Sequence, residues 1–324
     1  MKKVNYVDYF KIFENKKKGS IVISIGEYHE FYSCGDEKSL DVNNMIGDIF
    51  SFYKNKINNA IKLHKIKKKE IVNKINLHLK KDESINLLIE MDILRCADLY
   101  EPSDYKTTDG DLMQVYESNL FQVCHELLMN KKKWKWTPVD PRGNMLFLKT
   151  LSDITKTLNV YNKYITEIEV YNHVDDLIIY SDDIYIFLED YDDDNYFKRQ
   201  IISSFNKIKQ LYKNCTNPKY FKIKPIGHLV GNLMTGFQDI YTHANLKNNK
   251  INILFTGSAH NKNMEPFFRK NGYTQLYAGD GFNYPNCMLI DINKINDILL
   301  KFYFNKISII NNLLISYKKN TGRV

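Results

Sequence analysis

Short apolar runs alternate along this chain with longer segments in which apolar residues recur at helical spacing. A run of five or six β-branched and apolar residues is too short for a buried helix and predicts a buried strand. We predict four core strands on this basis, at Ser20–Ile25, Ile85–Ile89, Lys135–Val139 and Ile251–Phe255. Two further runs, Tyr273–Tyr277 and Cys287–Ile290, predict edge strands.

The segments between these strands predict helices. We expect helices from Asp41 toward Lys80, near Leu112–Met129, at Gly227–Leu246, and at Met264–Asn271, where Gly272 ends the helix. Residues 145–215 predict mostly helix, interrupted by the acidic stretch "DDIYIFLEDYDDDN" at 182–195, which we expect to be a solvated insertion. From Ile292 onward the pattern predicts a closing helix or two.

Alternation of strands and helices predicts right-handed crossovers and a mainly parallel central sheet flanked by helices. The length of 324 residues allows a large core, and the 44% hydrophobic and 13% aromatic content excludes a disordered chain. We therefore predict a single α/β domain over residues 1–324, with a mostly helical insertion around 145–247.

The net charge of +8 raises the question of nucleic-acid binding. Its source is lysine, which accompanies abundant Asn and Ile, as in proteins from the AT-rich genome of a giant virus, a poxvirus-like virus or a protist. The chain has five arginines, whereas a surface that reads DNA uses more arginine for base edges and phosphates. We expect no specific nucleic-acid binding.

Cysteine usage and apolar segments bear on the compartment. Five scattered cysteines without a C-x-x-C pair predict neither a disulfide framework nor a structural zinc site, and they fit a reducing compartment. The start, "MKKVNYVDYF", lacks the apolar region of a secretory signal, and no apolar stretch approaches the length of a membrane span. We expect a cytoplasmic protein with no membrane span.

Ionisable residues follow every predicted core strand. Loops at the carboxyl ends of parallel strands share one crevice, and buried ionisable groups are costly unless they are paired or used. Two histidines and a carboxylate can hold a divalent metal or divide the acid and base roles, and an arginine can stabilise an oxyanion. The residues, strand by strand, are Glu27 and His29, Glu90 and Asp92, Asp140 and Arg142, and His260 and Asn261.

Two of these junctions share a Gly-x-x-His pattern, "GEYH" at 26–29 and "GSAH" at 257–260. Glycine before the histidine lets the chain turn sharply and lets a ligand approach the backbone. With "IEMD" and "DPRG" between them, the chain resembles the Tiki, TraB, erythromycin esterase and ChaN superfamily, in islands spread over residues 20–290. The resemblance implies a Tiki/ChaN-like core with helical insertions.

The resemblance also implies site residues and a reaction. It points to His29, Glu90, Arg142 and His260 as catalytic, with His29, Glu90 and His260 as ligands of a divalent metal (Mn, Co or Zn). Similar proteins include metal-dependent peptidases, metal-independent lactone hydrolases and a haem-binding protein. We add Glu27 to the catalytic candidates. For substrate binding we expect Asp92, Asp140, Asp239 and Asn261.

Two functions follow from these residues. The first is a hydrolase that cleaves a peptide or ester bond in a peptide or small-molecule ligand. The alternative is a non-catalytic protein that binds a ligand, haem or a host factor in the same crevice. Structural roles also stay open, with the histidines as loop caps and Glu90 as an ion-pair partner of Arg142.

A second group of polar residues, His228, Asp239 and His243, has the spacing of one stripe on a helix. The surrounding stretch "FQDIYTHA" at 237–244 would then line the cleft. The alternative is an ordinary polar helix face.

Overall fold

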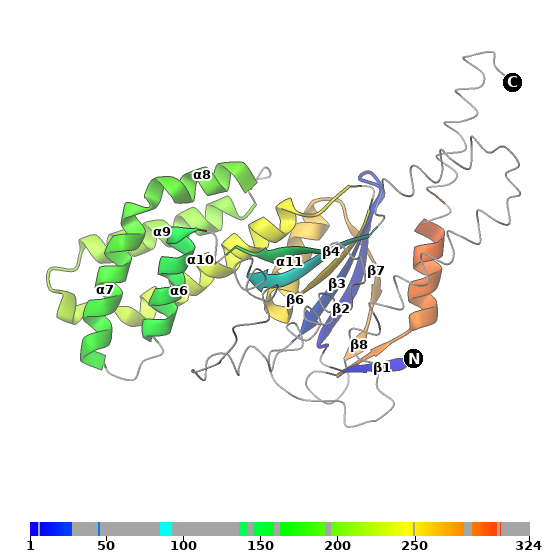
Figure 1. Ribbon diagram of the computed structural model, residues 1–324, viewed down its shortest axis with the longest axis horizontal. Helices are drawn as coiled ribbons and strands as arrows, with labels where there is room; N and C mark the ends of the chain where they lie inside the picture. Colours follow the sequence, from blue (N-terminus) through cyan, green and yellow to red (C-terminus); the bar gives the residue numbers. More distant parts are fainter. Residues whose placement is uncertain are drawn as a thin grey trace, which may run out of the picture. The chain divides into compact units, whose positions relative to one another are not determined.

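The computed structural model describes residues 1–5, 7–27, 45, 85–92, 136–141, 145–158, 163–191, 196–248, 250–281, 287–302 and 305 (Figure 1). These residues form helices and a central β-sheet, so the α/β class is confirmed. The helices predicted at 41–80 and 112–129 lie outside the described residues, apart from Met45, which is helical and buried. His29 and Arg142 also lie outside them.

Six strands are hydrogen-bonded in the order β5–β4–β6–β3–β2–β7. β4 and β5 are parallel, whereas β2 is antiparallel to both β3 and β7, so the sheet is mixed. Its strands are β5 (Trp136–Asp140), β4 (Ile85–Asp92), β6 (Ile251–Gly257), β3 (Ser20–Glu27), β2 (Tyr9–Asn15) and β7 (Thr274–Ala278). A separate three-stranded sheet contains β1 (Lys2–Asn5), β9 (Cys287–Ile290) and β8 (Asp280–Gly281).

The chain divides into two compact units. The first comprises Met1–Asn86, Lys247–Leu254 and Gly272–Val324. In it β2 and β3 form a hairpin that the sequence analysis missed, closed by a turn in which Gly19 has a φ of 58° and Lys18 N–H donates to Asn15 Oδ1. β2, β3 and β7 run side by side (Figure 1). Every residue of β3 is buried, as its apolar run predicts.

A buried asparagine ties the first unit together. Asn252, on β6, is fully buried, and its Oδ1 accepts hydrogen bonds from Asn86 Nδ2 and Lys247 N–H, both at 2.9 Å. Its Nδ2 donates to the carbonyl oxygens of Lys247 and Ile21, at 3.0 and 3.3 Å. Four hydrogen bonds thus make this amide compatible with an apolar interior.

The second unit, Leu87–Leu246 and Phe255–Asn271, is rich in helices (Figure 1). α10 carries buried apolar residues at helical spacing, among them Ile226, Val230, Leu233 and Phe237. The helices of the second unit are α6 (Leu146–Leu158), α7 (Lys163–Ile179), α8 (Ser181–Tyr191), α9 (Lys198–Lys213), α10 (Ile223–Ala244) and α11 (Ser258–Lys270), with a 3₁₀ turn, η1 (Pro218–Tyr220).

The acidic stretch at 182–195 was expected to be a solvated insertion, and this prediction was wrong for its first ten residues, which lie in α8. Ile184, Phe187 and Leu188 recur at helical spacing and are buried. The Phe187 ring packs edge-on against Phe147 of α6 and Phe237 of α10. The carboxylates of α8 lie on its exposed face. The prediction followed the density of charge and overlooked the apolar residues at helical spacing between the charges.

Two further observations concern cysteines and membranes. Cys287 is disulfide-bonded, which the scattered cysteines did not predict, and Cys215 is free. None of the helices in the described part of the chain has the length and apolar character that a membrane crossing requires.

Candidate active site

His260 lies between two carboxylates in the second unit. Its Nδ1 is 2.9 Å from Asp239 Oδ1, and its Nε2 is 3.5 Å from Glu90 Oε1. The side chains are largely buried, with exposed fractions of 16% for His260, 7% for Glu90 and 3% for Asp239. An imidazole with an acidic partner at each ring nitrogen has its orientation set on both sides.

Glu90 is oriented by the start of α11. Its Oε2 accepts a hydrogen bond from the N–H of Gly257, at 2.5 Å, and Gly257 is the N-cap residue of that helix. The first N–H groups of a helix carry partial positive charge and favour a carboxylate. The φ of −57° at Gly257 is accessible to any residue, so this glycine does not serve the sharp turn that the sequence predicted.

α11 begins at Ser258, directly after β6, rather than at Met264 as predicted. Asn261 explains the early start. It is fully buried, and its Nδ2 donates to Thr256 Oγ1 at 2.7 Å and to the carbonyl oxygens of Thr256 and Gly257 at 3.2 Å. Asn261 therefore fixes the strand-to-helix junction that carries His260 in the first turn of α11.

The pKa of Asp239 is raised above its usual value. Burial raises its pKa from 3.8 to about 6, and the charge of Glu90 adds to that effect. Hydrogen bonds to His260 and Asn263, and the charge of His260, lower the pKa but do not cancel the effect of burial. A carboxyl group that titrates near neutral pH in contact with a histidine is typical of functional sites.

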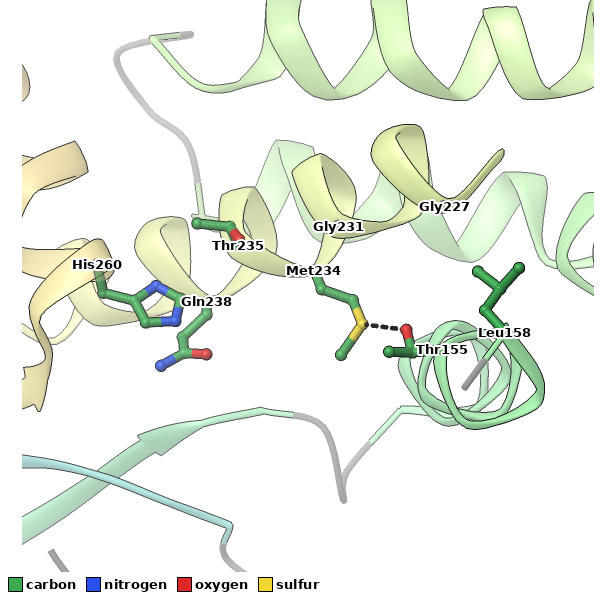
Figure 2. Close-up of a pocket in the computed structure, with 8 residues that line it drawn as sticks. All are labelled: Thr155, Leu158, Gly227, Gly231, Met234, Thr235, Gln238 and His260. Atoms are coloured by element: carbon green, nitrogen blue, oxygen red, sulfur yellow. Dashed lines mark hydrogen bonds between the residues drawn. The ribbon is translucent and has the colours of Figure 1, made fainter. Parts of the chain in front are cut away.

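A cavity of about 430 Å³ opens beside His260 (Figure 2). Figure 2 shows the side chains of His260, from α11, and Gln238, from α10, next to each other. Gln238 is 4% exposed, and its Nε2 is buried and has no hydrogen-bond partner among the described residues. The lining residues are Thr155, Leu158, Gly227, Gly231, Met234, Thr235, Gln238 and His260.

The donor atoms suit part of a metal site. Two ligands of one tetrahedral Zn²⁺, each about 2.1 Å from the ion, lie about 3.4 Å apart, close to the 3.5 Å between His260 Nε2 and Glu90 Oε1. A carboxylate on the other ring nitrogen, as in Asp239, is the usual support of a metal-bound histidine. Within the described residues no group of three or more His, Cys, Asp or Glu side chains is placed to hold a metal.

The other candidates occupy strand ends. Glu27 is the buried last residue of β3, in the first unit. Asp92 and Asp140 are the last residues of β4 and β5 and are paired in register, and Asp140 is buried. Glu27, Glu90 and Asp92 thus belong to the strands themselves, which run two or three residues further than predicted.

Of the second group, Asp239 is the member bonded to His260. His228 is exposed on α10, and the His243 ring packs against Phe267 with 4.1 Å between ring centroids. Sequence reasoning did not single out Gln238, although it lies in the stretch expected to line a cleft. Its signal was a polar amide on the apolar stripe of α10, next to Asp239.

Comparisons with protein-family models, curated proteins and solved structures find no match to this chain.

Proposed function

We propose that this chain is a hydrolase that cleaves an ester or peptide bond at the site formed by Glu90, Asp239 and His260. The observation that carries the proposal is the position of His260 between two carboxylates at the edge of a cavity. The resemblance to the Tiki, TraB, erythromycin esterase and ChaN superfamily, and a Tiki/ChaN-like core, are part of the same proposal.

Asp239 and His260 form an acid–base pair. When Asp239 accepts the hydrogen on Nδ1, the imidazole is held in the tautomer that leaves Nε2 as the atom to accept a proton. Nε2 removes a proton from water, the water oxygen bonds to the substrate carbonyl carbon, and the C–O or C–N bond breaks. The proton on Nε2 then passes to the departing oxygen or nitrogen.

Glu90 positions the water. Its separation of 3.5 Å from Nε2 is longer than a good N–H···O hydrogen bond of about 2.9 Å, so the contact is loose enough for a water to approach both acceptors. Glu90 itself is held in place through Gly257 N–H. Arg142 as oxyanion donor and His29 as third metal ligand stay predictions from the sequence, since both lie outside the described residues.

Glu90 and His260 would also hold a divalent metal ion. When bound, such an ion makes its water more acidic and polarises the scissile carbonyl. The roles of the chain's own residues are then Asp239 orienting the imidazole and Gly257 N–H orienting the carboxylate.

The test is hydrolysis of p-nitrophenyl esters and fluorogenic peptides by the full chain, with Mn²⁺, Co²⁺ or Zn²⁺ added and after chelation. His260→Asn should lower kcat about a hundredfold or more, as loss of a general base does. His173→Asn, on α7 and partly exposed, is the matched control and should retain activity. Equal activity of both variants, or none in the unaltered chain with every metal, would overturn the proposal.

A further inference from the structure

We propose that the cavity lined by α6, α10 and the first turn of α11 binds an uncharged acyl chain, with Gln238 Nε2–H donating a hydrogen bond to its carbonyl oxygen. The inference rests on the proposed function, because it names the class of substrate that the site would take. Binding measurements that involve no hydrolysis test it.

Gln238 supplies the recognition. Its Nε2 is buried without a partner among the described residues, and an amide left in that state costs free energy that a ligand oxygen would recover. The hydroxyl of Thr155, across the cavity, already donates to the Leu151 carbonyl oxygen and Met234 Sδ. The amide of Gln238 is a donor next to His260 whose Nε2 makes no hydrogen bond to the described residues.

The charge of the cavity favours a neutral ligand. Among the described residues that line it, His260 is the titratable one, and none is Lys or Arg. Asp239 and Glu90 flank that histidine, so an anionic ligand would be desolvated beside two carboxylates, and the described lining offers no Lys or Arg to offset them. A carbonyl oxygen needs only the single N–H of Gln238.

The far wall suits an aliphatic chain. Leu158 and Met234 supply apolar surface, and α10 contributes glycines at 227 and 231 to the wall. Gly231 lines the cavity and is exposed, and a Cβ built there meets no atom within 4 Å, so a side chain at this position would enter the open part of the cavity. The distance along α10 from Gln238 to Gly231 thus sets the chain length that the cavity accepts.

The first experiment measures binding of methyl ketones with propyl, pentyl and heptyl chains by calorimetry, since ketones have a carbonyl and no cleavable ester or amide bond. We expect the ketones to bind and the carboxylates of equal length to bind much more weakly. Gln238→Leu should weaken ketone binding roughly tenfold, the loss of one hydrogen bond, yet raise the melting temperature by removing a buried unpartnered amide. A lower melting temperature with unchanged binding would assign Gln238 a purely structural role and overturn the inference.

The second experiment fills the cavity. Gly231→Leu should abolish binding of the heptyl ketone and leave the propyl ketone close to its original affinity. Asn232→Leu adds the same side chain at the neighbouring exposed position of α10 and should change neither. If Gly231→Leu leaves the chain-length profile unchanged, the cavity is not the acyl site.

These outcomes separate the two proposals. Chain-length-dependent ketone binding without any ester or peptide hydrolysis would contradict the proposed function and support the acyl site. Hydrolysis that depends on His260, with binding indifferent to Gln238→Leu and Gly231→Leu, would do the reverse.

Discussion

The Nδ1 atom of His260 lies 2.9 Å from Oδ1 of Asp239, which joins the first turn of α11 to α10 across 21 residues of sequence. The bond places a nearly inaccessible carboxyl group behind a histidine whose other nitrogen faces Glu90. The hydrogen bonds and the charge of His260 offset only part of the cost of burying the Asp239 carboxylate, so the pKa of Asp239 stays raised. The buried Asp239 carboxylate lowers the folding stability and orients the imidazole of His260, a combination that is common at functional sites.

The first prediction concerns Asp239 and pH. Folding raises this pKa from 3.8 to about 6, so the folded chain binds the proton more tightly than the unfolded chain does. The stability that the protonated carboxyl contributes is complete below pH 3.8 and is lost as the pH rises through about 6. The ionised group then costs on the order of 3 kcal/mol. Asp239→Asn, neutral throughout, should gain stability relative to the unaltered chain across that window. Urea unfolding measured at several pH values checks this, and a pH-independent difference would contradict it.

The second prediction compares neighbours on β4. Glu90→Gln keeps an oxygen to accept from Gly257 N–H and removes a charge facing His260, so hydrolysis should be lost with little change in stability. Ile89→Ala removes a fully buried side chain and should cost about 2–5 kcal/mol of unfolding free energy. Thermal melts and activity assays on both variants check the contrast. If Glu90→Gln unfolds the chain as badly as Ile89→Ala, Glu90 is a structural ion-pair partner.

The third prediction tests the contact of α10 with α9. A Cβ at Gly236 would lie 2.9 Å from Cγ1 of Ile201, so Gly236→Ala should destabilise the chain by about 1–3 kcal/mol despite the better helix propensity of alanine. Ile201→Ala removes the obstructing atoms, and the double variant should be more stable than the sum of the single effects implies. A double-mutant cycle of chemical denaturation measures this coupling, and strict additivity would argue against the close packing.

The fourth prediction concerns the buried amide in the first unit. Asn252→Ala removes the hydrogen bonds to the Lys247 N–H and carbonyl and to the Asn86 amide, and should cost about 3 kcal/mol or more of unfolding free energy. Asn86→Ala removes one of these hydrogen bonds and should cost less. Equilibrium unfolding of the two variants gives the comparison, and equal losses would show that Asn252 is not the centre of the network.

The hydrophobic pattern of the sequence was sufficient to predict strands that are buried along their length. β9 begins and ends where its apolar run does, and the runs beginning at Ser20, Ile85 and Ile251 are strands, because a buried strand needs an uninterrupted apolar stretch. Polar residues predicted to follow two of these strands also led to a site, since the side chains of Glu90 and His260 lie 3.5 Å apart.

Tertiary structure decided what depends on distant partners. The direction of β2 follows from its pairing with β3 and β7, and the start of α11 follows from the amide of Asn261 turning back onto β6. Nor could periodicity tell that Asp239 faces a histidine or that the Gln238 amide is buried beside a cavity. A hydrophobic pattern reports how much of a segment is buried, whereas the partner of a buried polar group is chosen by contacts between residues far apart in the chain.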